Sequence, residues 1–403
     1  MKRREFIKNA TCIAVGSALI PQFLAGCTTD EVKRYLRGYK RLVVLHLGGG
    51  NDGLNTIVPF RNDIYYKLRP QLAIPPEKVL KLNDELGAHP AIEGLKKLYD
   101  RGYLAIFNNV GYPDIKGYPS IELSHFKASD IWSSGLTPDK DRTPQHGWLG
   151  KYLDLVAAKS EDAFLGVEAS TSFELSLKGE KIQGININSL ETINRLSDYR
   201  GYLVHSHEHE HPIASYIREV SMHAVFSTDV LNDYFKEYSF SYPDSELAGQ
   251  FRKVAALIKG GAPARCFFLK HATYDSHQAQ VGSHEKLLKE MADAVHAFAT
   301  DLETSGLFDD TLILIYSEFG RRVAENRNLG TDHGRGNNLF VISGSLKKQG
   351  ILNELPDLET LAYRNDVAVH LDFRRIYATI LERWLEVPAE KVLGERFPLL
   401  DFV

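Results

Sequence analysis

Long apolar runs without polar alternation mark the first predicted elements. Residues 41–47, RLVVLHL, and residues 312–316, LILIY, each have the length of one strand. Continuous apolar runs of this kind are typical of strands buried on both faces of a sheet. Residues 264–270, ARCFFLK, and residues 103–107 read the same way. The pattern therefore predicts a sheet that is covered on both sides.

Helical periodicity lies between these runs. Ile92, Leu95 and Leu98 recur on one helical face before Arg101-Gly102, and residues 284–303 form a long amphipathic pattern. Strands that alternate with helices predict an α/β fold with a largely parallel sheet. Residues from about 155 to 260 show weaker strand signals, and we expect them to form a less regular excursion from the same domain.

Composition narrows the class of protein. The chain has 403 residues, of which 43% are hydrophobic and 25% charged, with a formal net charge of -4. These values are typical of a soluble globular protein with a large core. The lysines and arginines form no basic excess or stripe, which argues against nucleic acid as a partner. After the first thirty residues no apolar stretch is long enough to cross a bilayer.

The N-terminus resembles an export signal. Arg3-Arg4 is followed by an apolar segment that ends in Leu-Ala-Gly-Cys27, as in a twin-arginine signal with a lipobox. We therefore expect a signal at 1–27, a lipid on Cys27, a polar tether at 28–40 and a catalytic-type domain at 41–403. The protein would be exported to the cell envelope and anchored to the membrane by the lipid. The alternative is an ordinary amphipathic N-terminal helix.

Cysteine usage agrees with this interpretation. Cys12 would leave with the signal and Cys27 would be acylated, so Cys266 would have no partner for an intramolecular disulfide. Cys266 lies in an apolar run, and we expect a buried structural thiol.

Two polar segments lie beside elements in the first part of the chain: one follows the first predicted strand, and the other begins a predicted helix. Asp52 lies in GGGNDGLNT, where glycines let the backbone approach a ligand and the carboxylate offers a hard oxygen. Its alternative role is a turn. Ser124 lies in LSHFKASDIW at the start of a helical pattern, where oriented N–H groups favour an alkoxide or phosphate oxygen. Its alternative role is a helix cap.

Two further segments lie downstream. Asp275 and His277, in YDSHQAQ, point to one side of an extended backbone and could bind one cation, or form a surface pair. The segment SEFGRRVAENRNLGTDHG places Glu318 just after a strand and brings Asp332-His333 into a turn. Arg321 or Arg322 could hold an oxyanion through a guanidinium fork, or lie in a solvated loop. Ligand sites gather at the carboxyl ends of parallel strands, so we expect these segments to meet.

A histidine cluster is set apart from this site. His205, His207, His209 and His211 alternate in HSHEHEH and could face a soft cation together. They lie in the poorly patterned middle region, which favours a solvated loop.

The order of these segments resembles the alkaline-phosphatase and sulfatase superfamily. The resemblance implies an alkaline-phosphatase-like α/β sandwich with a mostly parallel central sheet flanked by helices. It implies Ser124 as the nucleophile and places Asp372 as a helix cap before the last helix. The ligands that it implies for a divalent metal are Asp52, Asp275, His277, Glu318, Asp332 and His333.

More closely, SHFKASDIW, GWLGKYLD, YDSHQAQ and SEFGRR with GTDHG resemble the exported bacterial family called domain of unknown function 1501. The match runs from about Arg41 to the C-terminus. One departure from the superfamily is Phe319, which stands where a histidine usually follows the acid. A single divalent cation, or one tight and one loose site, therefore fits better than a complete zinc pair; zinc, calcium and magnesium all stay open.

These observations favour a metal-dependent hydrolase of phosphate or sulfate esters, acting on a small molecule or a glycan. Ser124 would attack the ester, and water would release the covalent intermediate. An inactive binding or scaffold lipoprotein with the same fold is the alternative, and a purely structural envelope protein would leave the polar strand ends without a reason. The hydrolase requires His333 to lie near Asp275 and His277, with Asp52, Ser124 and Glu318 around the same pocket.

Overall fold

A computed structural model describes residues 38–113, 123–136, 143–157, 166–171, 174–182, 184–187, 239–262, 264–362 and 365–403. The predicted signal, Cys27, most of the tether and the cluster from His205 to His211 lie outside these residues. Of the predicted excursion, the described parts include two short strands and one long helix of the main fold. The proposed domain limits stay a prediction.

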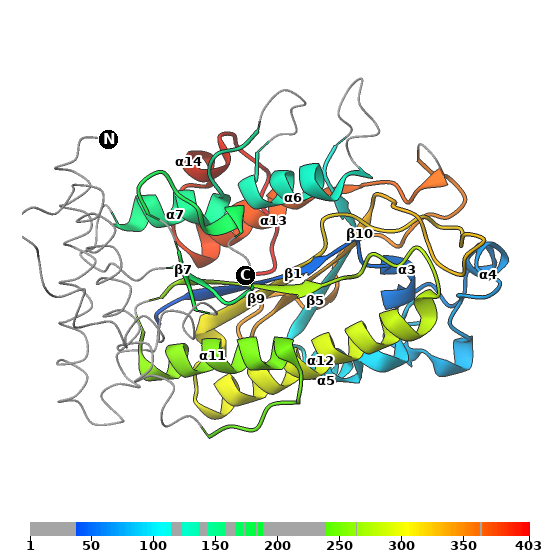
Figure 1. The fold of residues 1–403 in the computed structure, drawn as a ribbon, viewed down its shortest axis with the longest axis horizontal. Helices are drawn as coiled ribbons and strands as arrows, with labels where there is room; N and C mark the ends of the chain where they lie inside the picture. The colour runs from blue at the N-terminus through cyan, green and yellow to red at the C-terminus, as the bar shows by residue number, and fades with distance from the viewer. Residues whose placement is uncertain are drawn as a thin grey trace, which may run out of the picture.

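A mixed, mostly parallel sheet forms the centre of the fold (Figure 1). Its nine strands follow the order β11-β5-β10-β9-β1-β8-β6-β7, and β12 pairs with β5. Only β10 runs antiparallel to its neighbours within the described sheet. The strands are β1 (Arg41–Gly48), β5 (Leu104–Gly111), β6 (Gly166–Glu168), β7 (Ile185–Asn186), β8 (Cys266–Ala272), β9 (Thr311–Tyr316), β10 (Asn337–Ile342), β11 (Gly350–Ile351) and β12 (Leu371–Asp372).

Helices cover both faces of this sheet, as the continuous apolar strands require. One layer contains α5 (Glu93–Asp100), α11 (Glu246–Gly260) and α12 (Gln280–Thr304), and the other contains α6 (His125–Ser134), α7 (Trp148–Ala157), α13 (Phe373–Thr379) and α14 (Ala389–Leu393) (Figure 1). Along β1, Val43 and Leu45 pack into the first core, whereas Leu42 and Val44 pack into the second. Strand β1 therefore joins two hydrophobic cores.

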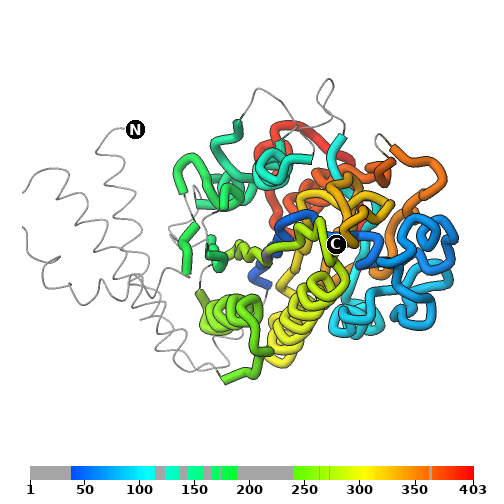
Figure 2. The backbone as a smooth tube through the Cα atoms, turned by 45° about the vertical axis from the view of Figure 1, so that its right-hand side comes forward, coloured from blue at the N-terminus to red at the C-terminus, as the bar shows by residue number. Residues whose placement is uncertain are grey.

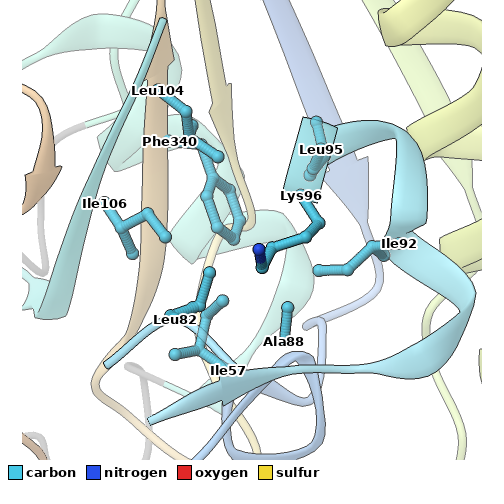
Figure 3. A pocket seen from close by; sticks show the side chains of 9 residues that line it. All are labelled: Ile57, Leu82, Ala88, Ile92, Leu95, Lys96, Leu104, Ile106 and Phe340. Carbon is cyan, nitrogen blue, oxygen red and sulfur yellow. The ribbon is translucent and has the colours of Figure 1, made fainter. Parts of the chain in front are cut away.

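Smaller elements flank one end of the sheet. They are α3 (Gly53–Thr56), α4 (Asp63–Leu68) and a three-stranded sheet of β2 (Ile57–Val58), β4 (Gly87–Ala88) and β3 (Leu80–Lys81). Short helical turns are η1 (Pro76–Lys78), η2 (Pro90–Ile92), η4 (Leu175–Leu177), η5 (Phe308–Asp310) and the π-helical η7 (Ile380–Trp384). A small apolar pocket between the two sheets is lined by Ile57, Leu82, Ala88, Ile92, Leu95, Lys96, Leu104, Ile106 and Phe340 (Figure 3).

The predicted elements are largely confirmed. The strand expected at 41–47 is β1, the long amphipathic pattern at 284–303 is α12 beginning one turn earlier, and α/β is the fold class. Cys266 is a buried free thiol, and Asp372 caps α13 by accepting a hydrogen bond from the Arg374 backbone N–H at 3.0 Å. Among the helices of the described residues, none combines the length and apolarity needed to span a bilayer.

Candidate metal centre

Three loops meet at the carboxyl ends of neighbouring parallel strands. The Tyr274 N–H donates to the Gly48 carbonyl at 2.8 Å, which joins the loop after β8 to the end of β1. The Thr331 N–H donates to the Ser276 carbonyl at 3.0 Å, which adds the long loop after β9. In Figure 2 the gold loop after β9 lies beside the yellow-green loop after β8, next to the blue end of β1. The predicted convergence of these strand ends is confirmed.

The buried guanidinium of Arg321 fastens the three loops together. It donates to the carbonyls of Gly50 at 2.6 Å, Thr331 at 2.9 Å and Tyr274 at 3.2 Å, and also to that of Gly49. Its remaining contact is with Asp275 Oδ1 at 2.6 Å. These contacts make Arg321 a positioning residue; the predicted contact with a substrate oxyanion stays a prediction.

Two glycines permit this close approach. Gly49 has φ +113° and Gly50 has φ +75°, values that side-chain-bearing residues rarely adopt. A Cβ on Gly49 would lie 2.6 Å from the Asp275 nitrogen, and one on Gly50 would lie 2.4 Å from the Phe319 ring. The glycine run after β1 is therefore needed to bring the loops into contact.

Asp275 is the centre of a cluster of imidazoles. Its Oδ1 lies 3.0 Å from His277 Nε2 and 3.1 Å from His333 Nε2, and its Oδ2 lies 3.4 Å from His125 Nε2. Burial by itself would raise the pKa of Asp275, but its contacts with Arg321 and His333 lower that pKa to about 2. The carboxylate is thus ionised at neutral pH and can bind a cation.

The ring nitrogens on the far side of two imidazoles are anchored. His125 Nδ1 lies 2.8 Å from Glu318 Oε1, and His333 Nδ1 donates to the Leu123 carbonyl at 2.8 Å. These bonds turn both Nε2 atoms toward Asp275, which is how metal-binding histidines are commonly oriented. His125 Nε2 is buried and has no hydrogen-bond partner among the described residues.

The potential ligand atoms of His125, Asp275 and His333 all lie within 4.8 Å of one another. His277 Nε2 adds a further nitrogen 3.0 Å from His333 Nε2. The His125 Nε2 atom, which faces Asp275 without a hydrogen bond among the described residues, and this close approach of two imidazoles both fit a shared cation. Because the donors are mainly imidazoles, they suit zinc better than calcium or magnesium, which prefer oxygen ligands.

Glu318 lies behind this cluster. It is buried, accepts from the Gly49 N–H at 2.8 Å, and bridges His125 and His46, whose Nε2 is 3.0 Å from Oε2. Burial opposes ionisation, but the hydrogen bonds with His125 and His46 hold the pKa of Glu318 well below its usual range. Glu318 in turn raises the pKa of His125. Its contacts are those of a residue that orients a ligand; direct metal binding by Glu318 stays a prediction.

The remaining predicted acids occupy two different settings. Asp332 Oδ1 lies 3.3 Å from His277 Nδ1 and accepts from Asn326 Nδ2 at 3.2 Å, at the exposed side of the cluster. Asp52 is fully buried and is engaged by Arg69 and Gln280, not by the imidazoles named above. The structure therefore brings Asp275, His277, His333, Glu318 and Asp332 together, and sets Asp52 apart.

Ser124 borders the cluster. It is the N-cap residue of α6, with φ −93° and ψ 120°, and its side chain makes no capping hydrogen bond. Its chain neighbours are Leu123, whose carbonyl accepts from His333, and His125, whose ring faces Asp275. The position agrees with the predicted role without testing it.

Two histidines of the site were absent from the predicted set. His125 directly follows Ser124 at the helix start, and His46 interrupts the apolar run of β1; a histidine inside a buried strand is the signal that could have revealed it. Phe319, at the position of the expected histidine, packs its ring 4.8 Å from that of His125 and 4.7 Å from that of His333. It forms an apolar wall of the cluster.

The fold and the site define an α/β protein with a candidate histidine-carboxylate metal centre at the carboxyl edge of its sheet. Within that class, the chain belongs to the family described as Protein of unknown function (DUF1501), whose model matches residues 39–388. No curated protein matches the sequence.

Several solved structures resemble the fold. A sulfatase from Pseudoalteromonas sp. has 13% identity, TM-score 0.39, and coverage of 97% of this chain and 74% of that one. A phosphonate monoester hydrolase from Silicibacter pomeroyi has 9% identity, TM-score 0.40, and coverage of 89% and 74%. A protein in the alkaline phosphatase superfamily from Vibrio parahaemolyticus has 10% identity, TM-score 0.38, and coverage of 86% and 66%. These values are too low to transfer any activity to this chain.

Proposed function

We propose that this protein is a metal-dependent hydrolase of phosphate or sulfate esters. The observation that carries the proposal is the meeting of His125, Asp275 and His333, in which the buried Nε2 of His125 has no hydrogen-bond partner among the described residues and faces Asp275 Oδ2 at 3.4 Å. Each of these side chains comes from a different segment, and local roles such as capping would not bring them together. A divalent cation gives the arrangement a reason.

The remaining residues fit such chemistry. When bound, the cation would act as a Lewis acid that neutralises the charge on the ester oxygens and lowers the pKa of a nearby hydroxyl. Ser124 Oγ would form the new bond to phosphorus or sulfur as the leaving alcohol departs, and water would then hydrolyse the ester on Ser124, which releases phosphate or sulfate and restores the hydroxyl. Arg321 would hold Asp275 in place through the 2.6 Å contact, and Phe319 would keep solvent from one side of the imidazoles.

We further propose that the enzyme acts in the cell envelope, on a small-molecule or glycan ester, while tethered to the membrane through Cys27. This location is supported by the N-terminal sequence alone. Replacing Cys27 with Ala should release the protein from the membrane fraction or leave it unprocessed.

The hydrolase can be tested with aryl phosphate and aryl sulfate and the zinc-loaded mature protein. Ser124→Ala should abolish turnover and keep most zinc binding, because Ser124 is not among the grouped ligands. Ser129→Ala, on the same helix, is the matched control and should stay active. Zinc-loaded wild type that turns over neither ester would favour the inactive binding protein, and full activity of Ser124→Ala would remove its assigned role.

A further inference from the structure

The Asp52 carboxylate has its acceptor positions filled by protein donors. Oδ1 accepts from Arg69 Nη1 at 2.9 Å and from the Asn55 N–H at 3.4 Å. Oδ2 accepts from the same Arg69 nitrogen at 2.7 Å and from Gln280 Nε2 at 2.5 Å. A carboxylate offers about four lone-pair positions, and here each oxygen makes two contacts, which three donor groups supply. A cation could bind Asp52 only by displacing one of them.

Arg69 is equally committed. Besides Asp52, its Nη1 donates to Asn55 Oδ1 at 2.7 Å, its Nε to the Val323 carbonyl at 2.7 Å, and its Nη2 to the Arg322 carbonyl at 2.8 Å. The guanidinium is fully buried against a fully buried carboxylate. The pair therefore balances its own charge and fixes the start of the loop that carries His333.

Gln280 connects this pair to the metal cluster. Its Oε1 accepts from Thr331 Oγ1 at 2.7 Å and from Ser276 Oγ at 3.1 Å. Ser276 stands between Asp275 and His277, and Thr331 lies two residues before His333. One buried amide thus links Asp52 to both ligand-bearing loops.

We propose that Arg69 takes the place of a second cation against Asp52, so that the chain binds one divalent cation, at His125, Asp275 and His333. Asp52 is then a positioning residue that acts through Gln280. The inference rests on the metal centre of the proposed function. It adds the number of ions that the chain binds, and it gives Asp52 a role other than that of a metal ligand.

Cobalt(II) titration of the mature protein tests this inference, because d–d absorption reports the ligands of the bound ion whether or not the protein is an enzyme. Wild type should bind one equivalent. Asp52→Asn should still bind one equivalent with an unchanged spectrum and an affinity lowered by roughly 10-fold, as for an outer residue. Asp275→Asn should lose the spectrum.

A double variant guards against misfolding. Asp52→Asn combined with Arg69→Gln replaces the ion pair by two neutral amides, and thermal unfolding without metal checks that it folds. It should also bind one equivalent. A wild type that binds two equivalents, one of which is lost in the folded Asp52 variants, would overturn the inference and leave the hydrolase standing. A wild type that binds no cobalt would overturn the metal centre itself.

Discussion

Asp52 and Asp275 are the same residue type in nearly the same place, yet their surroundings differ. Each follows one of two adjacent parallel strands, β1 and β8, and each accepts hydrogen bonds from a buried arginine. Asp52 is 0% exposed, and its carboxylate accepts hydrogen bonds from Arg69, Gln280 and Asn55. Asp275 has a side chain that is 35% exposed and faces three imidazoles.

The difference teaches that position at a strand end does not decide the role of an acid. A carboxylate whose acceptor positions are filled by fixed donors holds the structure. A carboxylate that shares its oxygens with titratable, reorientable imidazoles can exchange those partners for a cation or a substrate. The partners of each acid, more than its burial, separate the framework from the site.

The strongest way to break this comparison is to remove each carboxylate in the metal-free protein. Asp52→Ala leaves Arg69 buried without its counter-charge and should lower the free energy of unfolding by about 3–5 kcal/mol. Asp275→Ala should cost less, because the carboxylate that is lost is 35% exposed and the buried guanidinium of Arg321 keeps the carbonyls of Gly50 and Thr331 as acceptors. Urea unfolding with a chelator present measures both. Equal losses would mean that both acids belong to the framework.

A second test changes Glu318, which contacts His125 and not Asp275 itself. Glu318→Gln should weaken zinc binding by about 10–100-fold, the usual effect of losing the carboxylate that orients a metal-binding histidine. Isothermal titration measures the change. Glu325→Gln is the control on the same loop and should leave zinc affinity unchanged, because the Glu325 carboxylate accepts hydrogen bonds from the backbone N–H groups of Gln71 and Leu72. An unaltered affinity in Glu318→Gln would contradict the orienting role.

The pH dependence of zinc binding sharpens the contrast further. Glu318 raises the pKa of His125, so His125 keeps its proton to a higher pH than an ordinary histidine and must release it to bind a cation. Burial lowers the pKa of His333, which is already neutral there. Affinity should therefore rise with pH by up to about tenfold per unit while His125 is protonated. Titration in buffers of different ionisation enthalpy counts the released proton, and Glu318→Gln should reduce that count.

The last prediction concerns a third carboxylate, that of Glu168. It is buried at the end of β6 and accepts from the Ser170 N–H at 3.2 Å, and burial raises its pKa to about 8. The unfolded chain gives up this proton near the ordinary value, so stability falls as pH rises from there toward 8. Glu168→Gln should remove that slope, which for a rise of the pKa from 4.5 to about 8 amounts to several kcal/mol at pH 8, at about 1.4 kcal/mol per pH unit. Urea unfolding of both proteins between pH 5 and pH 9 measures this slope. If the variant keeps the slope of the wild type, Glu168 is ionised in the folded protein and the prediction is wrong.

The strands that position the site could be predicted because each is a continuous apolar run, and β1, β8 and β9 lie where the pattern placed them. The meeting of Asp275, His277 and His333 could be predicted because they lie in the loops that follow those strands. His125 could not be recognised, since a histidine at a helix start is ordinary until its long-range contacts are known. The ion pair of Asp52 could not be predicted either, because its partner Arg69 lies after a separate helix. Nor could the antiparallel direction of β10, which depends on its pairing with β5 and β9.

The anchoring of His333 by the Leu123 carbonyl has a mechanical consequence. The two residues are 210 positions apart, and His333 and Asp275 are 58 apart. A cation held by His125, Asp275 and His333 would therefore act as a removable cross-link between α6 and two distant loops. Because the three ligands meet only in the folded chain, the bound ion stabilises the closed arrangement of these segments. Ion occupancy would then govern how often α6 detaches, and hydrogen exchange in residues 125–134 would report it.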